Sequence, residues 1–401
     1  MTGLHTRSLP SADLVARRQA GSGLASLALL VPGVREQETE GNAGLTHLMV
    51  RAALRADRGR LVERAERLGG SLGAVSTLET AGWSITVPPE HVADAATVLA
   101  ELATAPGLAA EDVAIEARLQ SDLARSQRDD MYRYPMQRVL AAAFAPDPYA
   151  LPPLGDPERV IGFTAADTGA WQAAWQTRRA LVVVVGDGDP EQLLDQCAAA
   201  LTAWPAREAA VSDASPTWNA RHVEEPRDKQ QSALAMGFPA PPARDPSRHA
   251  FVVMGAVLSG LAGRLFDELR EKRSLAYTVQ ARPWMRRRAG AVLAYIATSP
   301  DRVDEVREAM LAELMRLVHE LVPDDELERA RQYAAGLHVM SLVHTAAVRD
   351  ALVDAWCTGT LDDLVEAPGR LRGVTAEDVQ AAARVFAQPR AEFVIRGSSS
   401  G

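Results

Sequence analysis

The chain has 401 residues, of which 47% are hydrophobic and 24% are charged, so it can bury more than one core and is long enough for two or three domains. Its 43 basic and 52 acidic residues give a net charge of −9 and are spread along the sequence. No basic block suggests a nucleic-acid groove or a membrane-binding patch, and we expect neither as a partner.

Compartment and redox state follow from two simple features. The N-terminal residues contain no apolar segment of the signal-peptide type, and the longest apolar runs have only the length of a strand. A cytoplasmic location is therefore the default, although a periplasmic chain whose leader had been removed would look the same. Cys197 and Cys357 fit neither a disulfide framework nor a CxxC metal site, so we expect both to be buried as small apolar side chains.

The first half of the chain predicts alternating strands and helices. Its first apolar strand and turn cover residues 26–33, and a helix begins after Gly44 because apolar residues recur at helical spacing from Leu45 to Ala52. The remaining elements are a strand at 81–87, a helix after a proline turn at 89–103, a helix with Thr164 as its N-cap, and a buried strand that ends at Gly186.

The second half repeats this order. Its elements are a strand at 233–241, a strand at 291–298, a helix after a proline turn at 300–315, a helix capped by Thr375, and a strand that ends at Gly397. The spacing from Thr164 to Gly186 equals that from Thr375 to Gly397, which indicates a duplication. We predict an α+β protein of two homologous domains, each an antiparallel-rich sheet with helices packed mainly on one face.

The domain boundaries follow from composition. Residues 201–222 are rich in Pro, Ser and Ala and show neither helical nor strand periodicity, so they form the best candidate for a linker. We accordingly assign an N-terminal domain to residues 1–204, the linker to 205–222 and a C-terminal domain to 223–401.

His47 lies on the second face of the first helix, together with Val50, Arg51 and Leu54. A zinc peptidase built on one helical turn needs two imidazoles four residues apart as ligands. It also needs a neighbouring carboxylate that takes a proton from the metal-bound water, and the motif HxxEH places all three groups on one face.

Five segments together carry a family resemblance. They are VPGVREQETEGNAGLTHLMVRAAL, LGGSLGAVSTLETAGWSITV, PDPYALPPLGDPERV and RRALVVVVGDGDPEQL in the first half, and GLAGRLFDELREKRSLAYTV in the second. In this order they resemble the pitrilysin/insulinase family of zinc peptidases, the inverzincins, from about residue 24 to residue 397. The resemblance implies the two-domain fold of that family and a role in peptide hydrolysis.

The zinc motif is degenerate. Where the family has HxxEH, this chain reads HLMVR, so Val50 replaces the general base and Arg51, a permanent cation, replaces the second histidine. The family's third ligand is a glutamate within residues 111–130, where the best alignment places Asp122 and an alternative places Glu116. We expect no zinc or other cofactor in this chain, and we expect His47 to be a polar helix residue that is hydrogen-bonded to a neighbour.

The second half keeps another pair of family residues. In ELREKRSLAYTV, Arg270 and Tyr277 stand at the family's separation. The resemblance implies that they hydrogen-bond a backbone carbonyl near the scissile bond of a peptide, and more strongly as charge develops on its oxygen. From the residues alone, Arg270 could equally be one exposed charge of a charged helix, and Tyr277 a core aromatic at the start of a strand.

Some bacterial members of the family are heterodimers in which one subunit carries HxxEH and the other the Arg/Tyr pair. This chain resembles the second kind, which implies a non-catalytic, substrate-binding subunit that is inactive alone and acts on peptides with a homologous zinc-bearing partner. The rival hypothesis is a structural or peptide-binding homodimer, like family members that serve as scaffold subunits of respiratory complexes. Retention of Arg270 and Tyr277 favours the first hypothesis.

Overall fold

The computed structural model describes residues 3–104, 107–202, 204 and 213–398. Residues 205–212 of the linker assigned above lie outside the described residues. The chain divides into two compact units. Unit 1 comprises Met1–Arg125, Leu151–Asp213 and Ser341–Cys357, and unit 2 comprises Ser126–Ala150, Ala214–Met340 and Thr358–Gly401.

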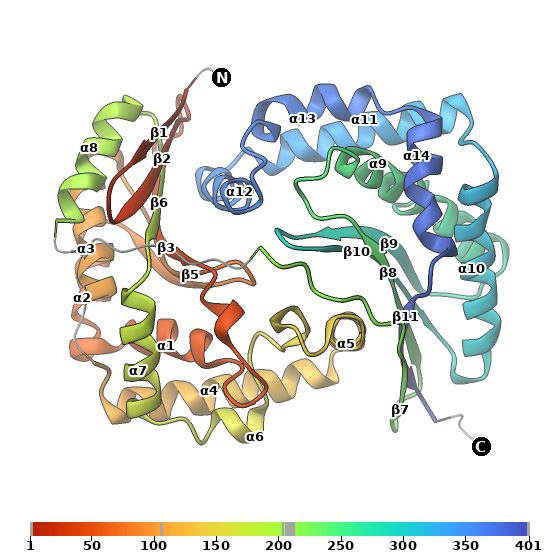
Figure 1. Ribbon diagram of the computed structural model, residues 1–401, viewed down its shortest axis with the longest axis horizontal. Helices are drawn as coiled ribbons and strands as arrows, with labels where there is room; N and C mark the ends of the chain where they lie inside the picture. The colour runs from red at the N-terminus through yellow and green to blue at the C-terminus, as the bar shows by residue number, and fades with distance from the viewer. Residues whose placement is uncertain (1–2, 105–106, 203, 205–212, 399–401) are drawn as a thin grey trace. The chain divides into compact units, whose positions relative to one another are not determined.

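Unit 1 is built on a six-stranded sheet (Figure 1). Its strands, in spatial order, are β1 (Leu4–Ser8), β2 (Ala12–Arg18), β6 (Ala180–Gly186), β3 (Ala25–Pro32), β5 (Thr80–Val87) and β4 (Ser71–Ser76). Only β2 and β6 pair in parallel; the other neighbours are antiparallel. The central strands β3 and β6 are buried along nearly their whole length, which explains their continuous apolar sequences.

One face of this sheet carries most of the helices of unit 1. They are α1 (Leu45–Ala53), α2 (Ala56–Arg67), α3 (Val92–Thr104), α4 (Ala110–Asp129), α6 (Pro157–Val160), α7 (Ala165–Gln176) and α8 (Pro190–Ala200). Figure 1 shows α3 and α8 along that face. The core between them includes Leu29 and Trp83 from the sheet and Leu48 from α1. Cys197 lies in this core and Cys357 is also buried, as predicted.

Unit 2 repeats this plan with five strands. Their spatial order is β7 (His222–Pro226), β11 (Ala391–Arg396), β8 (Ser232–Ala240), β10 (Gly290–Thr298) and β9 (Thr278–Met285), and only β7 and β11 pair in parallel. The helices of this unit are α9 (Arg248–Leu258), α10 (Val303–His319), α11 (Asp324–Ser341), α13 (Asp363–Arg372), α14 (Ala376–Ala383) and α5 (Arg133–Phe144). In Figure 1, α10 and α14 lie on one side of β8 and β11, and α5 lies on the other.

The predicted duplication is confirmed by this shared topology. Reading β2, β6, β3, β5 and β4 across the first sheet gives the same order and directions as β7, β11, β8, β10 and β9 across the second. Thr164 and Thr375 begin equivalent helices, and each forms a capping box with the aspartate three residues later. The predicted α+β fold with helices mainly on one face of each sheet is therefore correct.

The second face of each sheet receives one helix from the opposite half of the sequence. Helix α5 belongs to unit 2, where Tyr134 packs edge-to-face on Phe393 with ring centroids 5.7 Å apart. Helix α12 (Thr345–Thr358) belongs mainly to unit 1, where Arg349 donates a buried hydrogen bond of 2.8 Å from Nη1 to Oγ of Ser26. The compact units therefore differ from the contiguous halves by this exchange.

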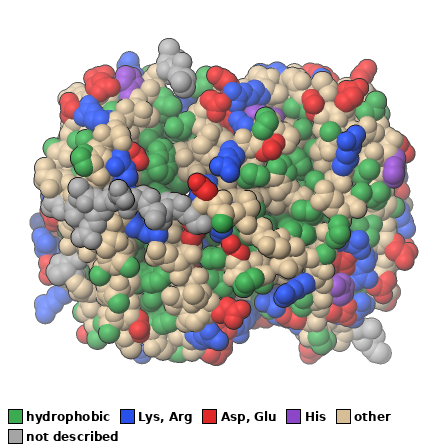
Figure 2. All heavy atoms as spheres, viewed as in Figure 1, with side chains coloured by type: hydrophobic (Ala, Val, Ile, Leu, Met, Phe, Trp, Pro, Cys, Tyr) green, Lys and Arg blue, Asp and Glu red, His purple; other side chains and the backbone are tan. Residues whose placement is uncertain are grey.

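None of the described helices is long and apolar enough to cross a bilayer. Basic and acidic side chains are interspersed over the face shown in Figure 2, in keeping with the even spread of charge along the sequence.

The two capping boxes should make similar contributions to stability. Thr164→Ala and Thr375→Ala each remove a side-chain acceptor for a helix N-terminal amide, so each should lower the free energy of unfolding by about 1 kcal/mol in urea denaturation. Thr97→Ala is a control, because Thr97 lies within α3 and its hydroxyl bonds only the Ala93 carbonyl of the same helix. A loss at only one of the two caps would contradict their equivalence.

Candidate functional site

The start of α1 is fixed by a close approach of two backbone segments. Gly44, which precedes the helix, has a φ of 88°, and a Cβ there would lie 2.7 Å from the Leu154 carbonyl oxygen and from the Gly155 nitrogen. Gln120 of α4 donates from Nε2 to the carbonyl oxygens of Gly44 and Leu154, both at 2.9 Å. These contacts place the first turn of α1, and with it His47, next to α4.

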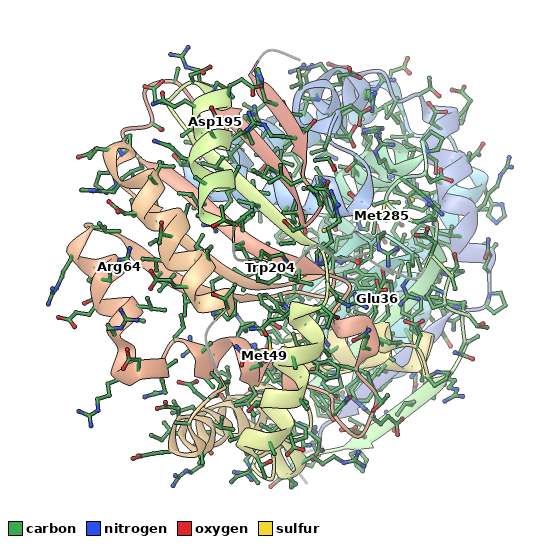
Figure 3. All side chains as sticks on the ribbon, turned by 60° about the vertical axis from the view of Figure 1, so that its left-hand side comes forward. Glu36, Met49, Arg64, Asp195, Trp204 and Met285 are labelled. Atoms are coloured by element: carbon green, nitrogen blue, oxygen red, sulfur yellow. The ribbon has the colours of Figure 1, made fainter. Side chains whose placement is uncertain are left out.

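The side of α1 opposite His47 packs into the apolar core of unit 1. Val50 is fully buried, and its carbonyl oxygen accepts a 2.9 Å hydrogen bond from Nε1 of Trp83 on β5. Met49 is buried in the same core; in Figure 3 it marks α1, and Arg64 marks α2. The position of the family's general base is thus part of the apolar core.

His47 is a partly buried, uncharged imidazole. Burial, together with the positive charges of Arg51 and Arg35, lowers its pKa to about 4, although Glu116 opposes this shift. Within the described ranges, no side chain or backbone group hydrogen-bonds to it. The structure therefore does not provide the hydrogen-bonded neighbour that we expected for His47.

Glu116 is the carboxylate that faces the degenerate motif. It is only 4% exposed on α4. Its Oε2 lies 3.4 Å from Nε of Arg51, and its Oε1 lies 2.5 Å from Nε of Arg55. Both arginine side chains are partly exposed, so each guanidinium extends from a buried carboxylate towards solvent. We call Arg51, Glu116 and Arg55 the ion triad.

Asp122, the residue that the best alignment places at the third-ligand position, does not contact the degenerate motif. Its side chain is 74% exposed and lies 3.4 Å from Nη1 of Arg125. A helix turns about 100° per residue, so six positions after Glu116 the side chain points to a different face. The helical spacing of Val113, Glu116, Ala117 and Gln120, all buried, was the sequence signal that favoured Glu116.

The residues present do not fit the zinc ion of the family. In the parts of the chain that the structure describes, no three His, Cys, Asp or Glu residues are grouped to hold a metal. His47 is the one imidazole of the motif, the Glu116 oxygens are already paired with two guanidiniums, and Arg51 would repel a cation. The described residues of unit 1 therefore do not supply the ligand set of the family's zinc ion.

Arg270 and Tyr277 lie on the surface of unit 2. Arg270 belongs to the π-helical segment Phe266–Lys272, and its guanidinium carbon lies 4.7 Å from the centroid of the Phe266 ring. Its side chain is 46% exposed, and its Nε is 3.9 Å from a carboxylate oxygen of Glu271. Tyr277, immediately before β9, is 71% exposed, so it is not a core aromatic.

The donor groups of this pair have few contacts among the described residues. Among the described residues, none accepts a hydrogen bond from the Tyr277 hydroxyl, and the Arg270 guanidinium has only the long contact with Glu271. The stacking of Arg270 on Phe266 is a local contact between residues four positions apart in one helical segment. The sequence could not reveal the contact of Arg55 with Glu116, because it depends on how α4 faces the junction of α1 and α2.

The two-unit fold and the degenerate motif define the class of a peptidase-like protein whose zinc motif is incomplete. Family models match the chain as insulinase (peptidase family M16) over residues 14–156 and as the peptidase M16 inactive domain over residues 170–333. The chain belongs to this insulinase family.

Relatives and solved structures agree with this assignment. An uncharacterized zinc protease of Streptomyces coelicolor is 25% identical over 372 residues, which cover 86% of this chain and 79% of the relative. The uncharacterized zinc protease YmxG of Bacillus subtilis is 20% identical over 302 residues, 75% of this chain and 74% of its own.

Similarity of fold extends over the whole chain. A peptidase M16 inactive domain from Pseudomonas fluorescens superposes with a TM-score of 0.87 at 17% identity, covering 99% of this chain and 98% of its own. A protease from Helicobacter pylori gives a TM-score of 0.87 at 15% identity and covers 98% and 99%.

The lowered pKa of His47 predicts a specific pH dependence of stability. Its folded pKa of about 4 lies below the ordinary value of 6.5, so the neutral form is favoured by folding. The burial of neutral His47 therefore contributes fully to the free energy of unfolding above pH 6.5, and this contribution is lost as the pH falls towards 4. Between pH 6.5 and pH 4, the free energy of unfolding should therefore fall by roughly 1–2 kcal/mol more in the wild type than in His47→Gln. This range allows for the partial exposure of His47.

The measurement is urea denaturation at several pH values between 4 and 7.5, with the difference between variant and wild type taken at each pH. His91→Gln is the control, since His91 is a more exposed histidine in the turn before α3. An equal pH slope for wild type and His47→Gln would show that His47 is protonated alike in the folded and unfolded states.

Proposed function

We propose that this chain is a non-catalytic, substrate-binding subunit of a heterodimeric zinc metallopeptidase. Its Arg270 and Tyr277 side chains would donate hydrogen bonds to a peptide that is bound at the zinc site of a homologous partner carrying HxxEH. The observation that carries the proposal is a contrast within the chain. Arg51 of the motif is paired with Glu116 in the ion triad, whereas the Arg270 and Tyr277 side chains of unit 2 are exposed and have no close hydrogen-bond partner among the described residues.

The chemistry suits a developing oxyanion. A guanidinium and a phenol both donate hydrogen bonds, and such bonds strengthen as a carbonyl oxygen gains negative charge during attack by water. Stacking on Phe266 limits the freedom of the Arg270 side chain without using its N–H groups. The π-helical turn around Arg270 is also a form of backbone that recurs at functional sites.

The strand that follows Tyr277 would contribute through side chains and not through its edge. At the centre of β9, the Ser259 hydroxyl lies 2.7 Å from the Ala281 amide nitrogen and 2.6 Å from the Ala281 carbonyl oxygen. Two residues later, Pro283 has no N–H to donate. Addition of an extended peptide as a further strand is therefore assigned to the partner subunit.

The alternative is a structural or peptide-binding homodimer. A solved structure described as complex III2 from Candida albicans with Inz-5 bound shares the fold at a TM-score of 0.85 and 16% identity. A scaffold role does not require exposed, unpaired donors, so the state of Arg270 and Tyr277 favours the peptidase subunit.

The first expected outcome concerns the chain alone. The purified protein should hold no stoichiometric zinc and cleave no peptide, because the general base and one ligand are missing. Metal analysis by mass spectrometry and a fluorogenic peptide assay are the measurements. One tightly held zinc per chain, with hydrolysis that a chelator abolishes, would overturn the proposal.

The second outcome concerns a mixture. With a homologous HxxEH subunit the chain should restore peptide cleavage, and Arg270→Ala or Tyr277→Phe should each lower kcat/KM by on the order of 10²-fold without preventing assembly. Light scattering after size-exclusion chromatography checks assembly.

Matched controls are available in unit 2. Arg384→Ala removes an exposed arginine that has no partner among the described residues, and Tyr333→Phe removes the hydroxyl of another exposed tyrosine. Both should leave kcat/KM near that of the wild type. If Arg270→Ala and Tyr277→Phe behave like these controls in an assembled complex, the scaffold role is the better explanation.

A further inference from the structure

Arg55 is the one residue of the ion triad that neither belongs to the motif HLMVR nor was considered as a third ligand. We infer that Arg55 is a second block to metal binding, and that unit 1 accepts zinc only when both Arg51 and Arg55 are replaced. This inference concerns a different site from Arg270 and Tyr277. Its test needs no partner subunit.

Arg55 makes a shorter hydrogen bond to Glu116 than Arg51 does. Its Nε lies 2.5 Å from Oε1, whereas Nε of Arg51 lies 3.4 Å from Oε2. Replacing Arg51 alone would therefore free one oxygen and leave the other in a short, charge-assisted hydrogen bond. A metal ion would have to break that bond and to bind beside the remaining guanidinium charge.

The backbone keeps Arg55 beside Glu116. The Arg55 amide donates to the Ala52 carbonyl at 3.0 Å, which continues the winding of α1 up to this residue. Directly afterwards Asp57, Arg58 and Gly59 adopt left-handed conformations and redirect the chain into the rest of α2. Arg55 thus stands at the junction of α1 and α2, where its position is set by both elements.

A ligand set remains around the triad once the arginines are gone. Residues 47 and 51 are four apart on α1, so Arg51→His would place two imidazoles on one face. Glu116 already contacts residue 51 from α4. Two imidazoles and one carboxylate are three protein ligands of the number and kind that zinc accepts. Zinc would then supply the positive charge that Glu116 loses with the arginines.

The test compares three variants of the isolated chain. They are Arg51→His alone, Arg51→His with Arg55→Met, and Arg51→His with Arg118→Met. Arg118 is the matched control, because it is an exposed arginine of α4 that bonds the Ala114 carbonyl and does not touch Glu116. The second and third variants thus lose the same number of charges.

The probes are zinc in equilibrium dialysis and cobalt(II) in visible absorption. We expect Arg51→His/Arg55→Met to bind one zinc at least about 10²-fold more tightly than the other two variants. Its Tm should rise with zinc concentration, since the metal binds only the folded chain. Glu116→Gln in the same background should abolish the binding and the shift of Tm.

Two results would overturn the inference. One is zinc binding by Arg51→His alone that is as tight as binding by Arg51→His/Arg55→Met. The other is a folded Arg51→His/Arg55→Met chain, shown by circular dichroism, that binds no zinc. If that variant does not fold, Arg51→His/Arg55→Gln takes its place under the same criteria. Because cleavage with a partner is not measured, these outcomes are separate from those that test Arg270 and Tyr277.

Discussion

Each sheet of this chain is apolar on both faces, and this constraint shapes the whole fold. The central strands β3, β6 and β10 are buried along almost their entire length, so helices on one face cannot shield them from water. In each unit the second face receives a helix from the other half of the sequence, α5 in unit 2 and α12 in unit 1. Neither half of the sequence therefore contains all the elements of one compact unit, so we expect neither to be stable alone.

Much of this fold could be predicted from the sequence, because its signals are local or repeated. The capping threonines, the proline turns before α3 and α10 and the apolar strands appear twice in the same order, and the structure shows them in equivalent places. The exchange of α5 and α12 could not be predicted. An apolar helix face has the same sequence pattern whichever sheet it covers. Only the three-dimensional packing determines the sheet on which the helix lies.

The candidate site shows the same limit at the scale of one residue. The sequence alone showed that Val50 and Arg51 replace two residues of the zinc motif. It did not show which acidic residue of α4 lies beside that motif. Alignment favoured Asp122, whereas the burial of Glu116 depends on which face of α4 meets α1. Arg55 does not belong to any of the motifs recognised in the sequence. Its significance comes from a contact between residues that are 61 positions apart.

The ion triad also explains how unit 1 accommodates a buried carboxylate on α4. A buried carboxylate with no partner is strongly destabilising, so Glu116 needs positive charge beside it. Arg51, which stands where the family has its second histidine, supplies one positive charge. Arg55 completes the neutralisation of Glu116, and Val50 extends the core where a second buried carboxylate would otherwise have needed a partner. Unit 1 thus keeps the fold of the insulinase family, with an ion triad and apolar packing at the positions of the zinc motif.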